Sequence, residues 1–497
     1  MHTPNIPLIV ALDVGTTSVR ALVFDARGNR LSALHATRPS PLRTTPDGGA
    51  EMDPDALVEA AVACLAEIGS QLGAQAGQVA GVATCTFWHS FLGTDAAGRP
   101  LTPIYTWADT RAAGEISRLR RRLDQTAVHA RTGAIFHTGY WPARLSWLRR
   151  TQGRLFRRVQ RWLSPGEYLY LRLLGAPLCS LSMASGTGLF DQNRLDWDDE
   201  VLAALGVDRE QLSPLVDLDS PARGLRPEWR ERLPYLAGVP WLPAIGDGAG
   251  SNVGSGCLDR AHLALMLGTS GAMRVLFEAA EAQAPLGLWL YRIDRRRYLM
   301  GGALSNGGNL LAWLHATLRL EMGPAMEAEL AALPPDGHGL TVLPFLAGER
   351  NPGYSPGATA TFSGLRWTTR PVEILQAGLE AVAYRMALIH ELLQPQLAPG
   401  AQIIASGGAF SALPYWAQIM ADVLGRPVAV SREAEASSRG AALLAAESLD
   451  LIADAGAAPP ELGAVYAPDP ARHERYRAGL ERQRSLYRKL VKGALRS

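Results

Sequence analysis

The stretch LIVALDVGTTSVRALVF, Leu8–Phe24, decides the fold of this chain. An apolar run ends at Asp13, a short turn spans Gly15–Ser18, and a second apolar run follows. Two aliphatic runs around a turn of small residues predict a β-hairpin from a buried sheet. The glycine lets the backbone amides approach a phosphate closely, and the hydroxyls can donate to it. The alternative is a plain hairpin turn whose hydroxyls satisfy its own backbone.

The same pattern returns in the second half of the chain. Leu263–Leu267 leads into the turn Gly268–Gly271, and Arg274–Phe277 forms the returning run. Both copies read as an apolar strand, a G-T-[ST] turn, an arginine and an aliphatic strand. Two such loops about half a chain apart predict a duplicated fold, whose halves face one phosphate chain from opposite sides.

The composition is typical of an ordinary globular enzyme, with 47% hydrophobic and 19% charged residues. A net charge of +2 argues against a dedicated nucleic-acid surface. The only two lysines, Lys489 and Lys492, lie in the C-terminal tail. A Walker A lysine, a protein-kinase lysine and a Schiff-base lysine are therefore excluded from the body of the chain.

The cysteines indicate a reducing compartment. All four are widely spaced without a CxxC motif, at Cys64, Cys85, Cys179 and Cys257. The run Leu8–Leu12 is too short for a signal peptide, and no run has the composition of a membrane span. We expect a cytoplasmic protein with no nucleic-acid or membrane partner, and its oligomeric state stays open, a homodimer included.

At 497 residues the chain should split into two large domains. The segment Pro240–Gly256 is rich in glycine and small residues, so we predict domains over 1–256 and 257–497. Helices are predicted after Asp53-Pro54, from 371 to 393 and over 115–123, 145–150, 414–424 and 438–448. Further strands are predicted over 31–35, 79–84, 288–293, 298–302 and 403–405.

Three clusters of residues could carry chemistry. Ser406–Gly408 is a third glycine turn after a buried strand, and three such turns suit a nucleotide held by amides and hydroxyls. Asp247 lies between two glycines and could accept the proton of a substrate hydroxyl, although an Asx turn is the commoner fate of such a residue. Aromatic and polar residues suited to a polyol site, each with a plain structural alternative, occur at Trp88, His89, Trp107, Asp109 and Arg111.

Together these motifs resemble the FGGY carbohydrate kinases over about residues 8–490. The matching segments are Asp13–Arg20, Trp107–Arg111, Gly246–Gly250, Gly268–Gly271, Gly301–Gly308, Gly348–Arg350, Ser406–Gly408, Ala421–Gly425 and Ser437–Ala442. The resemblance implies an α/β, two-domain actin-like or hexokinase-like (ribonuclease H-like) ATPase fold. Each domain would be a mixed sheet with helices, with a cleft between the sugar side and the nucleotide side.

Within the family, the chain is most similar to the gluconate kinases. The segments responsible are His89-Ser90, Leu101–Pro103, Thr106–Asp109, Ala184–Phe190, Leu195–Trp197 and Asn306–Gly308. The resemblance implies ATP-dependent phosphorylation of a small sugar or sugar acid, with gluconate converted to 6-phosphogluconate.

The resemblance also assigns roles. Asp247 would be the general base, and Asp13 would act beside it by holding Mg²⁺ near the transferred phosphoryl group. Nucleotide contacts would come from Thr16, Thr17, Ser18, Arg20, Thr269, Gly308 and Gly408. Sugar contacts would come from Trp88, His89, Trp107, Asp109 and Asp247.

Some residues depart from the family pattern near the sugar side. Arg144 stands where the family has lysine in a K-L-x-W element, and Trp88 replaces the usual methionine before the histidine. Gly139–Pro142 is unusual, and Ala360-Thr361 replaces an arginine-glycine pair. By sequence, Arg111 and Arg144 are the nearest cations for a substrate carboxylate. Two alternatives stay open: a xylulose or ribulose kinase, and, from another class, an actin-like or chaperone-like ATPase.

Overall fold

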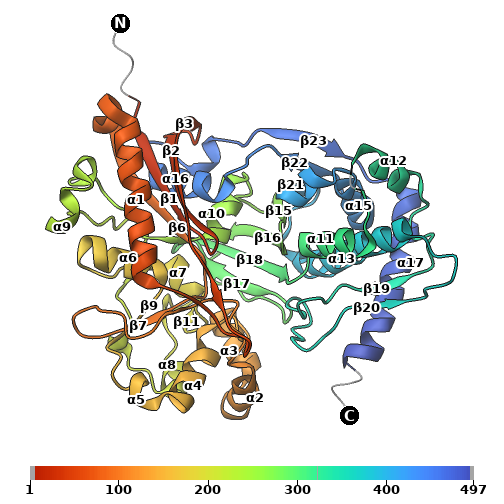
Figure 1. The fold of residues 1–497 in the computed structure, drawn as a ribbon, viewed down its shortest axis with the longest axis horizontal. Coiled ribbons are helices and arrows are strands. Elements are labelled where there is room, and N and C mark those ends of the chain that lie inside the picture. The colour runs from red at the N-terminus through yellow and green to blue at the C-terminus, as the bar shows by residue number, and fades with distance from the viewer. Residues whose placement is uncertain (1–5, 322, 493–497) are drawn as a thin grey trace, which may run out of the picture.

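The computed structural model describes residues 6–321 and 323–492, and its architecture is two sheets with helices packed on each (Figure 1). The first sheet has five strands in the order β14-β6-β1-β2-β3. Their bounds are β1 Leu8–Val14, β2 Ser18–Asp25, β3 Arg30–Pro39, β6 Val79–Thr86 and β14 Ile245–Gly246. Every residue of β1 is buried, so the apolar run that opens the chain forms the centre of this sheet.

The second sheet has seven strands in the order β17-β18-β16-β15-β21-β22-β23. Their bounds are β15 His262–Leu267, β16 Gly271–Glu278, β17 Trp289–Arg292, β18 Arg297–Leu304, β21 Gln402–Ser406, β22 Val428–Ser431 and β23 Leu462–Tyr466. Helices α11 (Gly308–Leu318), α13 (Pro371–Leu393), α15 (Tyr415–Leu424) and α17 (Pro470–Tyr487) belong to this half.

The two sheets repeat one topology. In the first, β1 pairs antiparallel with β2 and parallel with β6, and β14 continues the parallel side. In the second, β15 pairs antiparallel with β16 and parallel with β21, and β22 continues the parallel side. The outer strands β3 and β18 are also antiparallel to their neighbours. The duplication expected from the two hairpins is therefore confirmed, with β17 and β23 added at the edges of the second copy.

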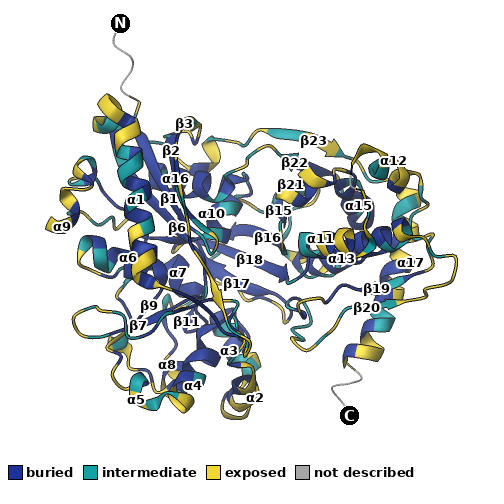
Figure 2. Ribbon diagram, viewed as in Figure 1, coloured by how far each residue is buried: buried dark blue, intermediate teal, exposed yellow. Residues whose placement is uncertain are grey.

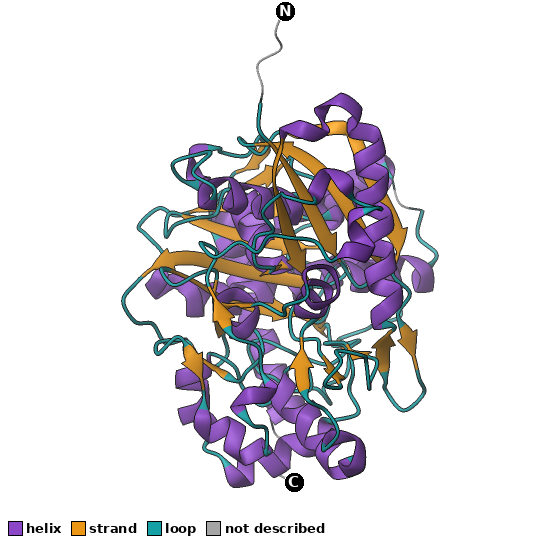
Figure 3. Ribbon diagram, turned by 90° about the vertical axis from the view of Figure 1, so that its left-hand side faces the viewer, coloured by secondary structure: helices purple, strands orange, loops and turns teal. Residues whose placement is uncertain are grey.

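A lobe made of short helices and strands is attached to the first sheet. Its main helices are α2 (Ala113–Arg122), α3 (Gln125–Thr132), α4 (Trp141–Thr151), α6 (Pro165–Leu174) and α8 (Asp199–Leu205). Figure 3 shows helices of this lobe at the bottom of the view, below the strands. The helix predicted over 145–150 begins earlier, at Trp141, because Pro142 occupies the first turn, where its missing N–H leaves no bond unmade.

Helix α1 (Pro54–Leu72) packs on β2 and β3, and α16 (Ala436–Ser448) packs on β1 and β6. Contrary to the expectation that no run has the composition of a membrane span, Pro54–Gln78 is long and apolar enough to cross a membrane. The core helix of a soluble protein meets the same criteria of length and composition. The apolar stripe of α1, from Leu57 to Leu72, is buried against the sheet, so packing within the fold accounts for its hydropathy (Figure 2).

Helix α16 joins the last part of the chain to the first sheet. It crosses α10 (Asp247–Gly254) at backbone contact: a Cβ at Gly440 would lie 1.9 Å from the Gly250 oxygen, and one at Gly254 would lie 1.9 Å from the Ala436 oxygen. Only glycine permits this approach. The predicted division after residue 256 stays a prediction, and α16 shows that packing crosses it.

Candidate active site

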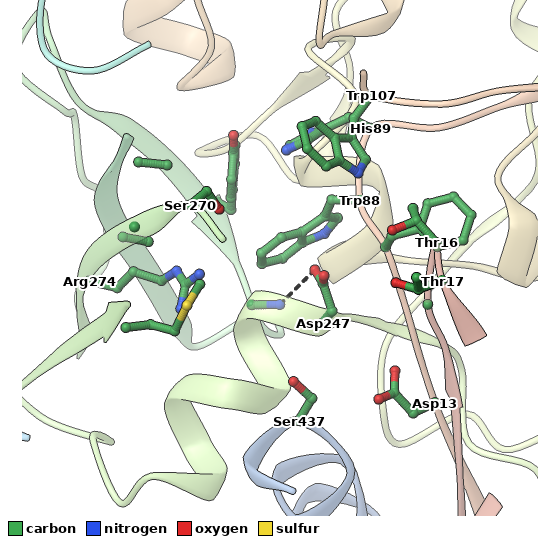
Figure 4. Close-up of a pocket in the computed structure, with 18 of the residues that line it drawn as sticks. Asp13, Thr16, Thr17, Trp88, His89, Trp107, Asp247, Ser270, Arg274 and Ser437 are labelled. Carbon is green, nitrogen blue, oxygen red and sulfur yellow. Dashed lines mark hydrogen bonds between the residues drawn. The ribbon is translucent and has the colours of Figure 1, made fainter. Parts of the chain in front are cut away.

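A cavity of about 330 Å³ lies between the two halves (Figure 4). From the first half it is lined by Asp13, Gly15, Thr16, Thr17, Ser18, Arg20, Phe87, Trp88, His89, Trp107, Asp247 and Gly248. From the second half it is lined by Met266, Ser270, Gly271, Ala272, Arg274, Trp289, Tyr291, Ala303, Arg350 and Ser437. The cavity thus joins both hairpin turns to the aromatic residues expected at a sugar site.

The first turn presents oxygen donors at the end of β1. The Gly15 amide donates to the Ser18 carbonyl at 3.0 Å, which closes the loop, and the three hydroxyls of residues 16–18 line the cavity. Asp13 lies opposite Arg20 in the β1–β2 register, and the two side chains form an ion pair. Arg20 also pairs with Glu435 at 2.7 Å, so its charge is balanced by two carboxylates.

The second turn forms one cluster with the other glycine turns. Gly308, the first residue of α11, donates to the Gly268 carbonyl at 2.7 Å, and a Cβ at Gly308 would lie 3.6 Å from the Ala409 Cβ. Ser270 and Gly271 line the cavity. Thr269 and the predicted adenosine contacts Gly308 and Gly408 lie outside its lining, so their contacts with nucleotide stay predictions.

Asp247 is the first residue of α10, directly after β14. Its Oδ1 accepts a hydrogen bond of 2.8 Å from the Gly248 amide (Figure 4). Desolvation in the cavity raises the pKa of Asp247 to about 6, although Arg274 and the backbone amides of Gly248 and Trp88 favour its charged form. A carboxyl with this pKa is mostly ionised at neutral pH and can still accept a proton, as a general base requires.

Trp88 forms the wall above Asp247, and three glycines make room for it. A Cβ at Gly246 would lie 1.8 Å from the indole Cε2, and Cβ atoms at Gly186 and Gly248 would lie 2.6 and 2.8 Å from the ring. The indole Nε1 donates to the Ser182 carbonyl at 3.0 Å. Tryptophan therefore fits here in place of the family's usual methionine, because glycines distant in sequence leave space for its ring.

His89 is held in one neutral tautomer. Its Nδ1 lies 2.5 Å from the Gly186 carbonyl, which can only accept, so Nδ1 carries the proton and Nε2 is left as an acceptor. Burial lowers the pKa of His89 to about 3. The residue has a φ of 67°, a strained conformation outside glycine, of the kind that clusters at functional sites. A neutral acceptor in the cavity wall suits a sugar hydroxyl.

Asp109, one of the expected sugar contacts, does not line the cavity. Its carboxylate is fully buried, where it accepts from the Ala50 amide at 3.2 Å and pairs with Arg111 at 2.5 Å. Arg111 also pairs with Glu51 at 2.7 Å and stacks on Trp147 at 4.8 Å. Both groups are engaged within the protein, so the structure does not bring Arg111 to a substrate carboxylate. The contact of Asp109 with sugar stays a prediction.

Arg144 is likewise turned away from the cavity. It donates to the carbonyls of Tyr105 and Thr106 at 2.8 and 2.7 Å and to that of Gly139 at 2.8 Å, and it also donates to the His89 carbonyl. Burial lowers its pKa to about 9. Arg144 therefore ties together the loops that carry His89 and Trp107, and the expectation that it meets a substrate carboxylate is not supported by its position.

Sequence reasoning missed two cations that do line the cavity, Arg274 and Arg350. Arg274 is 8% exposed and its Nη1 has no hydrogen-bond partner among the described residues. Signals existed for both: Arg274 is the arginine of the second hairpin pattern, and Arg350 closes the Gly348–Arg350 motif. What the sequence could not reveal is that both side chains turn toward one cavity.

Comparisons with known proteins agree with the family resemblance seen in the sequence, over nearly the whole chain. The model of the FGGY family of carbohydrate kinases, N-terminal domain, matches residues 8–254, and the model of its C-terminal domain matches residues 263–449. A gluconokinase of Bacillus subtilis is 26% identical over 93% of this chain and 91% of its own length. A xylulose kinase of Escherichia coli is 29% identical over 97% of this chain and 99% of its own. A crystal structure of gluconate kinase from Lactobacillus acidophilus superimposes with a TM-score of 0.91 at 26% identity, covering 98% of both chains.

Proposed function

The chain belongs to the FGGY family of carbohydrate kinases, and on this premise we propose that it transfers phosphate from ATP to gluconate, with Asp247 as general base. The observation that carries the proposal is the position of Asp247. It lies at the start of α10, in a cavity bounded by the first hairpin turn and by the side chains of Trp88 and His89. Phosphoryl transfer to a sugar hydroxyl requires a base between the loop that binds the phosphates and the wall that binds the sugar.

In the proposed reaction, the ionised Asp247 accepts the proton of the substrate hydroxyl as that oxygen attacks the γ-phosphorus of ATP. The bond from phosphorus to the bridging oxygen of ADP breaks, so ADP leaves with the bonding electrons. The hydroxyls of Thr16, Thr17, Ser18 and Ser270 donate to phosphate oxygens and stabilise the developing charge. Closure of the cavity excludes water, which would otherwise compete as acceptor.

The first turn also fits a Mg²⁺ ion. Asp13 is 4% exposed, lines the cavity and lies beside the hydroxyls of residues 16–18, so the donors are hard oxygens of the kind that Mg²⁺ prefers. Asp13 would hold the ion, directly or through water, and its ion pair with Arg20 orients the carboxylate. Bound Mg²⁺ would neutralise charge on the transferred phosphoryl group.

Two observations support gluconate over a neutral sugar. The segments from His89 to Trp197 that resemble gluconate kinases belong to the sugar-side lobe, and two of the three arginines that line the cavity, Arg274 and Arg350, form no ion pair among the described residues. The overall identities do not separate the substrates, because the gluconokinase and xylulose kinase relatives are about equally similar. A pentulose such as xylulose or ribulose is therefore the second candidate. Membership of a carbohydrate kinase family argues against an actin-like or chaperone-like ATPase.

The test is a substrate screen coupled to ADP release, over gluconate, xylulose, ribulose, polyols and glycerol, with and without Mg²⁺. We expect the highest kcat/KM on gluconate and loss of turnover when EDTA removes the metal. A kcat/KM more than about tenfold higher on a pentulose, equivalent to about 1.4 kcal/mol of transition-state discrimination, would overturn the assignment of gluconate. It would leave the proposal of a carbohydrate kinase standing.

A further inference from the structure

Arg350 stands out among the cavity residues because the loop around it is rigidly held while its own charge has no partner. Among residues 6–321 and 323–492, no carboxylate lies within the 4.0 Å of an ion pair with its guanidinium. A cation facing a cavity without a counter-charge favours an anionic ligand.

Glu349, the residue before Arg350, attaches the loop to helices of the second half. Glu349 is 3% exposed and forms an ion pair with Arg385 of α13. Its Oε2 accepts from the Tyr487 hydroxyl of α17 at 2.6 Å, and the Gly353 amide donates to Oε1, the oxygen paired with Arg385, at 3.2 Å. The loop is therefore attached to two long helices of the second half.

Asn351, the residue after Arg350, attaches the loop to β18 and to the segment around Gly287. Asn351 is fully buried, and its side chain accepts from the Ala303 amide of β18 at 2.9 Å and donates to the Gly287 carbonyl at 2.6 Å. It also donates to the Tyr354 hydroxyl at 2.8 Å. With both neighbours locked in place, the Arg350 side chain is presented to the cavity by a preorganised backbone, which lowers the entropic cost of binding.

The two unpaired arginines occupy different parts of the cavity. The Arg274 guanidinium lies beside the reacting end, because a Cβ at Gly248 would be 3.4 Å from its Cζ and its charge lowers the pKa of Asp247. Arg350 lies toward the aromatic wall: its charge contributes to the lowered pKa of His89, and its backbone carbonyl accepts a hydrogen bond from the Tyr354 amide. That wall is further built by the Tyr140 hydroxyl, 2.6 Å from that of Tyr291.

We propose that Arg350 binds the carboxylate of an aldonic acid, so that the far end of the chain meets Asp247. This inference rests on the proposed kinase function and adds an orientation to it. With the carboxylate at Arg350, the hydroxyl most distant from the acid group is the one that reaches the base. The planar guanidinium can hold a carboxylate through two parallel hydrogen bonds, and a neutral ketose offers no charge to pair with it.

The test compares two ligands that differ only at one end, D-gluconate and D-glucitol, in which CH₂OH replaces the carboxylate. Binding of each to the wild type and to Arg350→Gln is measured by calorimetry with a nonhydrolysable ATP analogue present, and gluconate turnover is measured in parallel. We expect Arg350→Gln to weaken gluconate binding by about 10- to 100-fold, with a smaller effect on kcat than on KM. Arg350→Lys, which keeps the charge but not the fork, should recover part of the loss.

Arg366→Gln serves as the matched control, because Arg366 is exposed on the same half and the substitution changes the net charge equally. It should leave gluconate affinity within about twofold. Thermal melting of each variant separates loss of the ligand contact from loss of the fold, and Arg350→Lys supplies a second variant should the glutamine protein melt early.

Three outcomes would overturn the inference: wild-type binding of gluconate no tighter than that of glucitol, equal weakening of both ligands in Arg350→Gln, or gluconate affinity unchanged in that variant. Failure of the proposed substrate looks different. A wild type that turns over xylulose best, yet binds gluconate more tightly than glucitol with that preference lost in Arg350→Gln, would overturn gluconate as the substrate and leave the carboxylate contact of Arg350 standing.

Discussion

Asp247 can act as a base only while its carboxyl is ionised, and enclosure in the cavity opposes ionisation. Its pKa is raised to about 6, so protonation in the free enzyme begins below neutral pH. We predict that kcat/KM for the sugar is constant above about pH 7 and falls about tenfold per pH unit below 6, because the protonated form cannot accept the substrate proton. A pH profile at saturating ATP measures this.

A second variant identifies which group causes that fall. Arg274 favours the charged form of Asp247, so Arg274→Gln should move the acidic limb to higher pH. An acidic limb that stays in place in this variant would assign the titration to another group, such as the ATP phosphates.

Asp247→Asn tests the base directly. The amide keeps the size of the side chain but cannot take a proton, so we predict that kcat falls by about 10²- to 10⁴-fold. Affinity for an ATP analogue should stay within about twofold, and thermal melting checks that the variant is folded. Turnover at the wild-type rate in a folded variant would place the base elsewhere.

At the scale of elements, the α10–α16 crossing holds the base in position. Gly440 of α16 lies against Gly250 of α10, the helix that Asp247 begins, and a Cβ at Gly440 would be 1.9 Å from a backbone oxygen. Gly440→Ala should therefore lower the free energy of unfolding by about 1–3 kcal/mol through overpacking, and it should lower kcat by displacing α10. Chemical denaturation and steady-state kinetics measure the two effects.

The control is Gly114→Ala in α2, where no atom lies within 4 Å of the added Cβ. This variant should be unchanged or more stable by up to about 1 kcal/mol, since alanine is the better helix former. Equal effects at the two positions would mean that helix propensity, and not the crossing, decides the result.

Arg144 acts on elements as well, because one guanidinium joins the carbonyls of separate loops on the sugar side. Lysine has three donors on a single nitrogen and cannot reach them all, so Arg144→Lys should leave buried carbonyls unpaired. We predict a loss of about 1–3 kcal/mol in the free energy of unfolding and a raised KM for the sugar, with the KM for ATP unchanged. A variant with wild-type stability and KM would show that the loops hold without it.

At the scale of the whole molecule, we predict that the two halves close over the substrates. The first phosphate loop and Asp247 belong to one half and Ser270, Arg274 and Arg350 to the other, so the cavity is completed only when both approach. Closure also excludes water, which would otherwise hydrolyse ATP.

Distances between spin labels measure this closure. Arg122→Cys on the sugar-side lobe and Ser363→Cys on β20 (Thr361–Ser363) are exposed positions on opposite halves, and all four native cysteines are buried. The label distance should shorten when an ATP analogue and gluconate bind together. A distribution that does not change with both ligands present contradicts the prediction.

Much of the fold follows from local pattern. The hairpins at residues 8–24 and 263–277 could be predicted because an apolar run, a glycine turn and a second run encode a strand pair within one short stretch. Their repetition then indicated the duplicated sheets. The positions of Asp13 and Asp247 in the cavity also follow from local order. Asp13 lies near the end of β1 and Asp247 directly follows β14, and the ends of parallel strands meet at one edge of a sheet.

Tertiary structure alone decided how the charged side chains are used. Arg111, Arg144, Arg274 and Arg350 are equivalent in composition, yet the first two are engaged by buried carboxylates and carbonyls and the last two face the cavity. Likewise, Trp88 fits only because glycines from two other segments lie beneath it, and α16 returns to the first sheet from the end of the chain. A backbone turn is determined by its own few residues, whereas the partner of a long side chain is determined by whichever distant segment packs beside it.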